Sequence, residues 1–573
     1  MIARVLPDVR AIDKIFDYVV PPEMTSHASV GAMVRVTLHG RRVGGWIVEL
    51  AETTETDKAL QPIAKIRGLG PPPEVVDLSA WAAWRWAGPR ATYLGTASPS
   101  TAVRGLPAAP VAAVTAAAPV ADDVAVEAFA GSETVVRLPP ARDPFPVVFE
   151  AARRGPALVL APSVDQAAHL AIRLRRGGFA VAVYPRDWAM AAAGGCTVVG
   201  ARAAAWAPLA RPAAVVVIDE HDEGYQEERA PTWNAREVAV ERARRAGAPC
   251  VLTSPCPSLE TLAATPLLTP SRAEERAGWP VLEIVDRRKE PPGLGLFSDR
   301  LVTLVREEDR VVCVLNRKGR ARLLACTACD ELARCEVCAS AVEQLPAMAL
   351  RCRRCGQQRP AVCASCGATG FRVLRAGVSK ARDDLQRLTG RPVVEVSADA
   401  STPTADAAVL VGTEAVLHRT RRADVVAFLD FDQELLAPRY RAGEEALALL
   451  ARAARLVGGR KGGGRLLAQT RMPTHEVLDA AVHADPGRFA LVESARRAAL
   501  RFPPDAAVAE ISGEAAAAFA AALNTVDGVE VLGPSSAGRW LARASDHRRL
   551  CDAMAATPRL PGRLRISVDP LRL

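Results

Sequence analysis

Eight cysteines between residues 326 and 366 are the residues of this chain best suited to chemistry. They form four C-x2-C pairs with the spacing C-x2-C-x5-C-x2-C-x13-C-x2-C-x7-C-x2-C. One C-x2-C turn holds two thiolates at the separation of two ligands of a tetrahedral zinc ion, so four turns can build two closed sites. Because no histidine lies among the eight and a four-thiolate site has no open position, the pattern favours structural over catalytic zinc.

Coincidental cysteines and transient disulfides are the alternatives to metal, but so many thiols in an intracellular chain favour metal. The remaining cysteines are expected to be buried as small apolar side chains; they are Cys196, Cys250, Cys256, Cys313 and Cys551. Arginines also flank the four pairs, at Arg334, Arg351, Arg353, Arg354 and Arg359. Their guanidinium groups could contact DNA phosphates or lie on a solvated surface, and the sequence favours neither.

The composition bounds the class of protein. The chain has 573 residues, 49% apolar and 24% charged, which is typical of globular protein and too long for a single core. The net charge of +9 and the pI near 9.0 favour a polyanionic partner. No apolar run reaches the roughly eighteen residues of a membrane span, and the N-terminus lacks an apolar signal core. A cytoplasmic protein is therefore expected.

The N-terminal hundred residues predict a small β-rich module. Alternating runs at 30–38 and 45–50 read as strands that flank the turn HGRRVGG, and residues 63–66 could add a third strand. A helix, VVDLSAWAAWRWAG, is expected after a proline breaker. The stretch from about residue 106 to 124 is rich in Ala, Pro and Val and predicts a linker.

Beyond the linker the periodicity changes to that of a parallel α/β sheet. Buried-strand runs at 157–162 and 213–220 alternate with helical stretches such as QAAHLAIRLRR. A second set of runs at 311–316, 408–414 and 424–432 predicts a second α/β lobe. The cysteine segment is inserted after the first strand of that second set.

The N-terminal motif IFDYVVP carries the first part of a family resemblance. Together with VRVTLHGRRVGGWIVEL, it resembles the FDY signature of the replication-restart helicase family of primosomal protein N-prime, PriA. The resemblance implies that this module holds the 3′ end of a nascent strand at a fork, in a pocket lined by Phe16, Asp17, Tyr18 and Gly40. An aromatic ring can stack on a base and a carboxylate can accept from a 3′-hydroxyl. Read alone, FDY is also typical of a core tripeptide with a surface carboxylate.

Further motifs extend the resemblance over almost the whole chain. VVGARAAAWAPL, VVVIDEHDEGY and CVLTSPCPSLET resemble motifs of the family's first lobe, and LNRKGRA and VLVGTE resemble motifs of its second. The resemblance implies two RecA-like helicase lobes and an interleaved zinc pairing, which the spacing alone leaves undecided. One ion would be held by Cys326, Cys329, Cys363 and Cys366, and the other by Cys335, Cys338, Cys352 and Cys355.

The predicted fold is α/β: two RecA-like helicase lobes, an N-terminal β-rich DNA-binding domain, an inserted two-zinc module of eight cysteines and a C-terminal α+β domain. Since only the Ala/Pro-rich stretch precedes lobe 1, the family's winged-helix domain is expected to be missing. The predicted boundaries are 1–103 for the 3′-end DNA-binding domain, 104–132 for the linker, 133–290 for lobe 1, 291–325 for the start of lobe 2, 326–369 for the zinc module, 370–480 for the rest of lobe 2 and 481–573 for the C-terminal domain.

The parts that hydrolyse ATP in such lobes are degenerate in this sequence. A phosphate cradle needs glycine N–H groups, a lysine and a Ser or Thr, whereas the matching segment 135–150 reads VVRLPPARDPFPVVFE and has none of these. Asp219 and Glu220 end an apolar strand where Mg²⁺ would be held, and we interpret them as relics of the family's DEEH box. RAARLVGG has Leu456 and Gly459 at the arginine-finger positions, whose arginines are worth about 10³–10⁵ in rate.

These observations predict a DNA-binding replication-restart protein that assembles the primosome at stalled or branched forks without ATP-driven unwinding. No residue is assigned as catalytic; two Zn²⁺ ions per chain are expected, and binding of ATP and Mg²⁺ is left doubtful. The expected partners are branched and single-stranded DNA and the replication-restart and single-strand-binding proteins, with a monomeric, nucleoid-associated chain and no membrane. A basic cluster could track phosphates or be a solvated loop; it comprises Arg452, Arg455, Arg460, Lys461 and Arg465.

Two other functions stay open from the sequence. One is an active ATP-dependent 3′-to-5′ DNA helicase with an unusual nucleotide site, for which GGGR at 462–465 would have to supply the glycines. The other is a zinc-ribbon transcription or RNA-binding factor, which the cysteines alone would permit. The motifs that flank the cysteines in both lobes argue against this last alternative.

Overall fold

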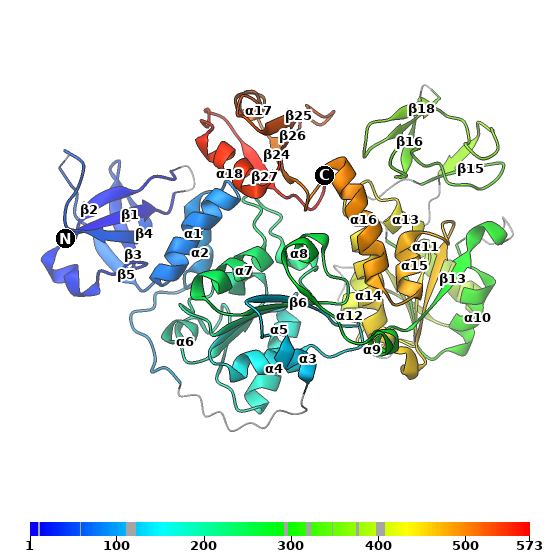
Figure 1. Ribbon diagram of the computed structural model, residues 1–573, viewed down its shortest axis with the longest axis horizontal. Helices are drawn as coiled ribbons and strands as arrows, with labels where there is room; N and C mark the ends of the chain where they lie inside the picture. The colour runs from blue at the N-terminus through cyan, green and yellow to red at the C-terminus, as the bar shows by residue number, and fades with distance from the viewer. Residues whose placement is uncertain are drawn as a thin grey trace. The chain divides into compact units, whose positions relative to one another are not determined.

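The structure, a computed structural model, divides into two compact units (Figure 1). Unit 1 contains residues 1–136, 143–268 and 500–571, and unit 2 contains residues 137–142, 269–499 and 572–573. The residues that the structure describes are 1–9, 12–57, 59–110, 122–290, 296–316, 323–346, 348–373, 378–396 and 407–573. Within these ranges no helix is both long and apolar enough to cross a membrane.

Unit 1 begins with an antiparallel sheet of five strands in the order β2-β1-β4-β3-β5. Its inner face buries the apolar side chains that alternate along the strands, for example Val34 and Val36, both 0% exposed. The strands are β1 (Ile2–Pro7), β2 (Phe16–Val19), β3 (Met33–Leu38), β4 (Arg41–Ala51) and β5 (Lys65–Gly68). A 3-10 helix, η1 (Pro22–His27), follows β2, and two α-helices follow the sheet, α1 (Pro73–Arg85) and α2 (Arg90–Ala97).

The turn between β3 and β4 is shorter than the sequence predicted. The two strands pair from Leu38 with Arg41 onward, so only His39 and Gly40 form the turn. Both have positive φ, 48° and 76°, the backbone that suits the twist of a two-residue hairpin. The rest of HGRRVGG is strand. Gly45 is required there because a Cβ would lie 2.7 Å from the carbonyl oxygen of Leu6.

Lobe 1 is built on a seven-stranded sheet in the order β12-β6-β11-β10-β7-β9-β8. Its central strands are fully buried apolar runs, such as AVVVI in β10, which is typical of a parallel sheet covered on both faces. The strands are β6 (Glu133–Arg137), β7 (Ala157–Leu160), β8 (Val181–Val183), β9 (Thr197–Gly200), β10 (Ala214–Ile218), β11 (Cys250–Ser254) and β12 (Leu267–Leu268).

The helices of lobe 1 begin and end at recognisable signals. Ser163 caps α5 by accepting from the backbone N–H of Gln166 at 3.2 Å, and Asn234 caps α7 in the same way. Gly247 ends α7 in the left-handed conformation. The helices are α3 (Asp123–Glu127), α4 (Phe145–Arg153), α5 (Val164–Arg176), α6 (Trp188–Ala193), η2 (Arg202–Trp206), η3 (Glu223–Tyr225), α7 (Ala235–Ala246) and α8 (Leu259–Ala264).

The chain returns to unit 1 at its C-terminal end as a small α+β domain. Four antiparallel strands lie in the order β25-β26-β24-β27, and two helices accompany them. The elements are β24 (Ala507–Ser512), α17 (Ala516–Leu523), β25 (Val529–Leu532), β26 (Trp540–Ala544), α18 (His547–Ala556) and β27 (Arg565–Val568). One hydrophobic core joins this domain to lobe 1 and to α1 and α2, because it includes Trp86, Trp206 and Phe519.

Unit 2 contains lobe 2, whose six-stranded sheet has the order β13-β23-β22-β14-β21-β20 with every neighbouring pair parallel. The strands are β13 (Val281–Asp286), β14 (Val311–Val314), β20 (Val393–Val396), β21 (Val409–Gly412), β22 (Val425–Phe428) and β23 (Arg465–Thr470). The helices are α9 (Arg272–Gly278), η4 (Arg287–Lys289), α10 (Asp299–Glu307), α11 (Val378–Thr389), α12 (Ala415–Arg419), α13 (Asp432–Leu435), α14 (Ala442–Val457), η5 (Arg460–Gly462), α15 (Glu476–Val482) and α16 (Pro486–Leu500).

The cysteine segment is inserted into lobe 2 after β14, as predicted. It consists of the strand pair β15 (Leu324–Cys326) and β19 (Phe371–Val373) and the three-stranded sheet β16 (Val342–Leu345), β17 (Ala349–Cys352) and β18 (Gln358–Pro360). A small apolar cluster in which Leu332 and Ala341 meet Leu436 joins it to lobe 2. The predicted fold class, with two RecA-like lobes and an inserted eight-cysteine module, is confirmed.

The predicted domain boundaries stay predictions. The structure's own division separates α16 from the C-terminal domain, since residues 481–499 belong to unit 2 and residues 500–571 to unit 1. Part of the predicted linker, 111–121, lies outside the described residues, and its last described part forms α3. The first module, lobe 1 and the C-terminal domain form one unit because they share a core.

A buried ion cluster lies where these three parts of unit 1 meet. Arg85, at the end of α1, is 5% exposed. Its Nη2 atom lies 2.7 Å from Glu237 Oε2 on α7 and 2.7 Å from Asp569 Oδ2, just after β27. His547 at the start of α18 places Nε2 2.7 Å from the same Asp569 oxygen. One guanidinium therefore ties together the first module, lobe 1 and the C-terminal domain.

Both titratable partners of this cluster have shifted pKa values. Burial alone would raise the pKa of Asp569, but His547 and Arg85 outweigh it and hold that pKa well below its usual range. Burial would likewise lower the pKa of His547, but Asp569 outweighs it and raises that pKa. The depressed carboxyl contributes stability above its unfolded pKa of about 3.9, and the raised imidazole contributes below its unfolded pKa of about 6.5.

We predict that Asp569→Asn lowers the free energy of unfolding of unit 1 by about 3–5 kcal/mol, because it leaves the buried guanidinium of Arg85 with Glu237 as its one carboxylate partner and removes the charge that faces His547. The loss should be largest between about pH 4 and 6.5, and should shrink as pH rises through the raised pKa of His547. Urea unfolding of both proteins across that range measures it. Asp552→Asn is the matched control, since the Asp552 side chain is 61% exposed. Equal losses in the two variants would contradict a structural role for the cluster.

Candidate metal centres and nucleic-acid interface

The eight cysteines gather into the two groups of four that the resemblance implies. Cys326, Cys329, Cys363 and Cys366 form one group, and Cys335, Cys338, Cys352 and Cys355 form the other. Within each group the sulfur atoms all lie within 4.8 Å of one another. The closest pairs are 3.4–3.6 Å apart. A tetrahedron with Zn–S bonds near 2.3 Å has edges of about 3.8 Å, so both groups are the size of a four-thiolate site.

Identical backbone turns position the four pairs. In each turn the N–H four residues after the first cysteine donates to that cysteine's carbonyl, at 2.9–3.0 Å. The residue after the second cysteine always has positive φ; these residues are Asp330, Ala339, Gly356 and Gly367. The N–H of the first cysteine then donates five residues ahead, at 2.8–2.9 Å. The fourfold repetition indicates a geometry built for the sulfur atoms rather than four unrelated loops.

Backbone donors also favour thiolates in these turns. The backbone N–H of Cys329 donates to the Cys326 sulfur and, with other donors, lowers the pKa of Cys326 to about 7. A metal needs the deprotonated form, so the turns are suited to hold one. The thiolate donor set fits Zn²⁺, which would be closed off from substrate by four protein ligands. The structure thus provides two groups that could each bind a metal ion.

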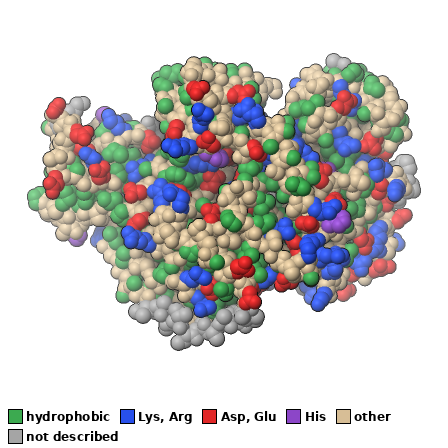
Figure 2. Space-filling view, viewed as in Figure 1, with side chains coloured by type: hydrophobic (Ala, Val, Ile, Leu, Met, Phe, Trp, Pro, Cys, Tyr) green, Lys and Arg blue, Asp and Glu red, His purple; other side chains and the backbone are tan. Residues whose placement is uncertain are grey.

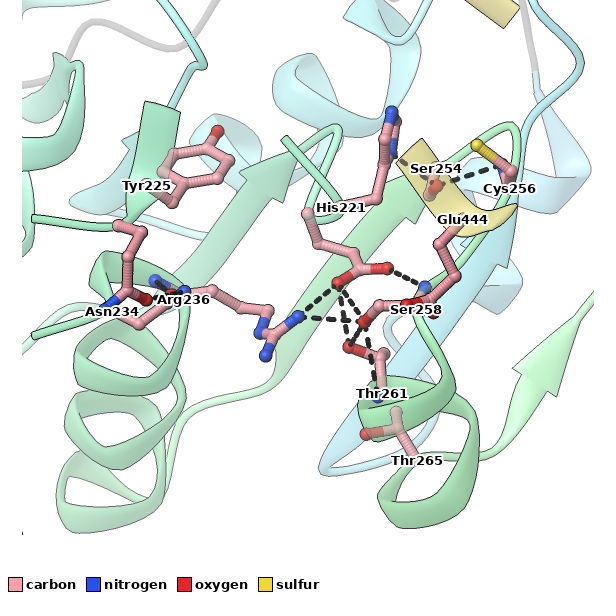
Figure 3. A network of polar contacts seen from close by, with 12 residues as sticks. His221, Tyr225, Asn234, Arg236, Ser254, Cys256, Ser258, Thr261, Thr265 and Glu444 are labelled. Carbon is pink, nitrogen blue, oxygen red and sulfur yellow. Dashed lines mark hydrogen bonds and ion pairs between the residues drawn. The ribbon is translucent and has the colours of Figure 1, made fainter. Parts of the chain in front are cut away.

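Glu220 follows β10, where a nucleotide-hydrolysing lobe holds its metal and water. The side chain is fully buried and its oxygens accept four hydrogen bonds. Ser258 donates through its backbone N–H at 2.7 Å and through Oγ at 2.9 Å. Two further residues donate to Glu220, Thr261 through Oγ1 and Arg236 through Nη1, each at 2.8 Å. Figure 3 shows Arg236, Ser258 and Thr261 converging on this point.

These contacts make Glu220 part of the packing between β10, α7 and the start of α8. Its lone pairs point at protein donors, and Arg236 balances its charge. The adjoining Asp219 is 3% exposed and has a φ of 53°, a backbone conformation uncommon for a residue other than glycine. His221 Nδ1 lies 2.7 Å from Ser254 Oγ, so the two family-like motifs remain in contact. The sequence did not reveal the roles of Arg236 and Thr261; the one signal was the place of Thr261 in the motif CVLTSPCPSLET.

The loop between β6 and α4 stands where a phosphate cradle would be. Pro139 and Pro140 are buried in it. Pro139 packs on Gly278, where a Cβ would lie 2.3 Å from the proline Cβ. Proline has no N–H to offer a phosphate. The two prolines therefore offer no backbone donors in this loop.

A carboxylate of the protein lies at the start of α4. Asp143 Oδ1 accepts from the backbone N–H of Phe145 at 3.0 Å. Arg173 on α5 donates to the same carboxylate through both terminal nitrogens, at 3.0 and 2.5 Å. Its guanidinium group lies 3.8 Å from the centre of the Phe145 ring. Burial works against ionisation, but Arg173 and this N–H outweigh it and lower the pKa of Asp143. An internal anion thus holds the helix terminus that an α-helix offers to phosphate. Sequence reasoning missed this pair.

The residues of the predicted 3′-end pocket lie in different surroundings. Phe16 and Asp17 are on the edge strand β2 and are partly exposed. Lys14 Nζ lies 5.7 Å from the Phe16 ring centre, and Thr54 Oγ1 donates to Asp17 at 2.5 Å. Tyr18, by contrast, is 3% exposed and belongs to the core of the sheet. The Phe16 ring and the Asp17 carboxylate are thus partly exposed, whereas the Tyr18 ring lies inside the sheet core.

Gly40 and the basic cluster near residue 460 complete the predicted interface. Gly40 is exposed at the tip of the β3–β4 hairpin, with open space where a Cβ would be. Arg452 pairs with Glu414 at 2.6 Å and Arg465 pairs with Glu283 at 3.2 Å, so both charges are engaged within lobe 2. Arg460 and Lys461 are exposed on η5. On the face shown in Figure 2, Lys and Arg are interspersed with Asp and Glu.

Comparison with known proteins agrees with this arrangement. Residues 4–99 match the family model described as 3'DNA-binding domain (3'BD). The chain is 31% identical to the replication restart protein PriA of Treponema pallidum, over 54% of this chain and 50% of that protein. It is 26% identical to the PriA of Bacillus subtilis, over 61% of this chain and 48% of the relative. In both alignments the chain spans about half the length of the curated relative.

Longer alignments cover most of the chain. The probable replication restart protein PriA of Mycobacterium tuberculosis is 28% identical over 576 residues, covering 88% of this chain and 85% of the relative. A DEAD box protein structure from Methanococcus jannaschii overlaps loosely, with 10% identity, a TM-score of 0.31 and coverage of 65% and 87%, too loosely to support an inference. The N-terminal domain match and the longer alignment agree in the similarity of this chain to replication restart protein PriA.

Proposed function

We propose that this chain binds stalled or branched replication forks and assembles the restart machinery there without ATP-driven unwinding. The observation that carries the second half of the proposal is the loop between β6 and α4. Its prolines lack N–H donors, and Asp143 with Arg173 holds the helix terminus where phosphate would bind. A nucleotide would have to displace this ion pair and would meet a carboxylate in its place.

The hydrogen bonds that Glu220 accepts from the protein support the same proposal. A carboxylate that activates water must present a lone pair to that water. The oxygens of Glu220 instead accept from Ser258, Thr261 and Arg236 in a site closed to solvent. The arginine-finger positions Leu456 and Gly459 add no guanidinium. Three separate parts of the hydrolytic apparatus are therefore unsuited to turnover.

DNA recognition is proposed to begin at the first module. The Phe16 ring can stack on a base, the Asp17 carboxylate can accept from a 3′-hydroxyl, and Lys14 beside the ring can meet the adjoining phosphate. Because unit 1 joins this module to lobe 1 through a shared core, a bound strand end would be held on a rigid body. Fork recognition and assembly then need no motor, only fixed surfaces for DNA and for restart and single-strand-binding proteins.

The two cysteine groups are proposed to hold one structural Zn²⁺ each. Such a site contributes about 10–16 kcal/mol of folding free energy in small zinc domains, and this segment has only a small apolar core of its own. The ions would fix the turns and the arginines that the turns carry. The proposed setting is the cytoplasm, with the chain acting as a monomer on the nucleoid.

The zinc content tests the two cysteine groups. Purified protein should contain two zinc ions per chain, and Cys338→Ser should contain one, as measured by elemental analysis together with colorimetric release. Chelation should open residues 326–369 to proteolysis. Cys313→Ala is the control, since its thiol is buried in β14 outside both groups. A loss of zinc from this control equal to that from Cys338→Ser would contradict the assignment.

DNA binding and ATP hydrolysis test the proposed function itself. Zinc-loaded, nuclease-treated protein should bind a fork with a free 3′ leading end more tightly than blunt duplex, and DNA should not raise ATP hydrolysis above background. ATP should not shift its unfolding temperature. Fork-stimulated hydrolysis would favour the active helicase instead. A preference for duplex or RNA would exclude fork recognition.

The stability of Glu220→Gln separates a structural role of Glu220 from a catalytic role. Glu220→Gln should lower the free energy of unfolding by about 1–3 kcal/mol, because the new amide nitrogen is a donor and would face the donors from which the carboxylate oxygens accept hydrogen bonds. Glu228→Gln, at an exposed position nearby, serves as the control and should change stability little. Urea unfolding of the three proteins gives the comparison. Equal stability of both variants would mean that Glu220 is not committed to packing.

A further inference from the structure

A cavity of about 310 Å³ lies in unit 2 between the second cysteine group and lobe 2. The turns that carry Cys338 and Arg354 form one wall, and the opposite wall comes from α13, α14 and the loop after β23. Five arginines line the cavity: Arg288, Arg334, Arg354, Arg471 and Arg496.

The carboxylates of the cavity are already paired. Glu331 lies 3.5 Å from Arg334, and both Glu476 and Glu493 are bonded to Arg496. Arg471 reaches Asp330 at 3.3 Å, while its buried Nε atom finds no hydrogen-bond partner in the described part of the chain. The three lining carboxylates thus pair with two of the five arginines, while Arg288 and Arg471 pair with Asp286 and Asp330, which do not line the cavity.

Arg354 is the cation least engaged by the protein. It lies between Cys352 and Cys355, and its Nη1 atom is 3.4 Å from Ser340 Oγ, a neutral partner. Among the described residues no carboxylate lies within ion-pair distance of it. Its neighbour Arg353 turns away from the cavity and pairs with Glu343, so the same turn offers a natural comparison.

The lining favours an anion over an apolar ligand. Leu435, Leu436 and Tyr440 contribute to the walls but are at most 7% exposed, so little apolar surface is open for the side chains of a peptide. Guanidinium groups match the paired oxygens of a phosphodiester and bind them with two parallel hydrogen bonds. A phosphate group also fits easily within 310 Å³.

We propose that this cavity binds the phosphodiester backbone of a single DNA strand, with Arg354 and Arg471 as the contacts and Arg334 at the rim. The inference rests on the proposed DNA-binding function and adds to it a site remote in sequence from the first module. Because the turn between Cys352 and Cys355 holds Arg354, the second cysteine group sets the position of a phosphate contact as well as stabilising the fold.

The salt dependence of binding to a single-stranded oligodeoxynucleotide tests this site. Each phosphate contact with a single strand contributes about 0.7 to the slope of log K against log salt. Arg354→Ala should reduce that slope by about this amount and weaken binding several-fold, while Arg353→Ala should leave both unchanged. Arg354→Lys should keep the slope, since it keeps the charge. Zinc content shows that each variant retains its turns, and Arg334→Ala supplies a second test from the other wall.

The outcomes separate this site from the proposed function. If the wild-type protein binds neither the oligonucleotide nor a fork, the proposed function fails and the site fails with it. If it binds a fork but Arg354→Ala and Arg334→Ala keep the wild-type slope, the function stands and the site is wrong. Equal losses in Arg353→Ala and Arg354→Ala would also overturn it. Arg354-dependent binding of a hexaglutamate peptide with unchanged DNA binding would assign the cavity to an acidic partner instead.

Discussion

The buried guanidinium of Arg85 is the interaction on which unit 1 depends. Removing an arginine from water costs several kcal/mol unless anions are placed around it, and here Glu237 and Asp569 come from two other parts of the chain. The buried charges of the three segments are therefore paired only when all three segments are packed together. This requirement explains why the first module, lobe 1 and the C-terminal domain share one core although more than 400 residues separate Arg85 from Asp569.

The same logic explains how lobe 1 can be stable without a bound nucleotide. Charged groups at a nucleotide site are arranged to meet phosphate and metal, and they would be costly if left unpaired. In this chain Arg173 meets Asp143, and Arg236 meets Glu220. Each charge has a protein partner in the place of a ligand. The sheet and its helices therefore need no nucleotide to complete them, and the lobe can act as a fixed scaffold.

Much of this fold could be predicted from the sequence. The runs at 157–162 and 213–220 became β7 and β10, and the cysteine spacing located the inserted module. These signals are local, since burial and turn geometry act over a few residues. The turn at His39 and Gly40 was placed too broadly, because glycine is as compatible with a strand as with a loop and only the register decides.

The candidate sites were predictable only in part, because partners distant in the sequence leave no local signal. The pairing of the cysteines came from a family resemblance, and the spacing could not supply it. Asp143 with Arg173, and Glu220 with Arg236, depend on how helices lie against the sheet. Tyr18 belongs to the motif of a ligand pocket, yet the two-residue period of β2 turns its ring to the opposite face from Asp17 and into the core.

The internal pairing of charges also changes what the basic composition means. A net charge of +9 suggests a broad attraction for DNA, but many arginines are held by carboxylates of the same chain, as Arg452 is by Glu414 and Arg353 by Glu343. An arginine in such a pair must give up one anion to bind another, so it adds little affinity. The strongest phosphate contacts should therefore come from the few cations that, like Arg354, have a neutral partner instead. The proposed specificity for a branched structure can then follow from the spacing of those few points, rather than from total charge.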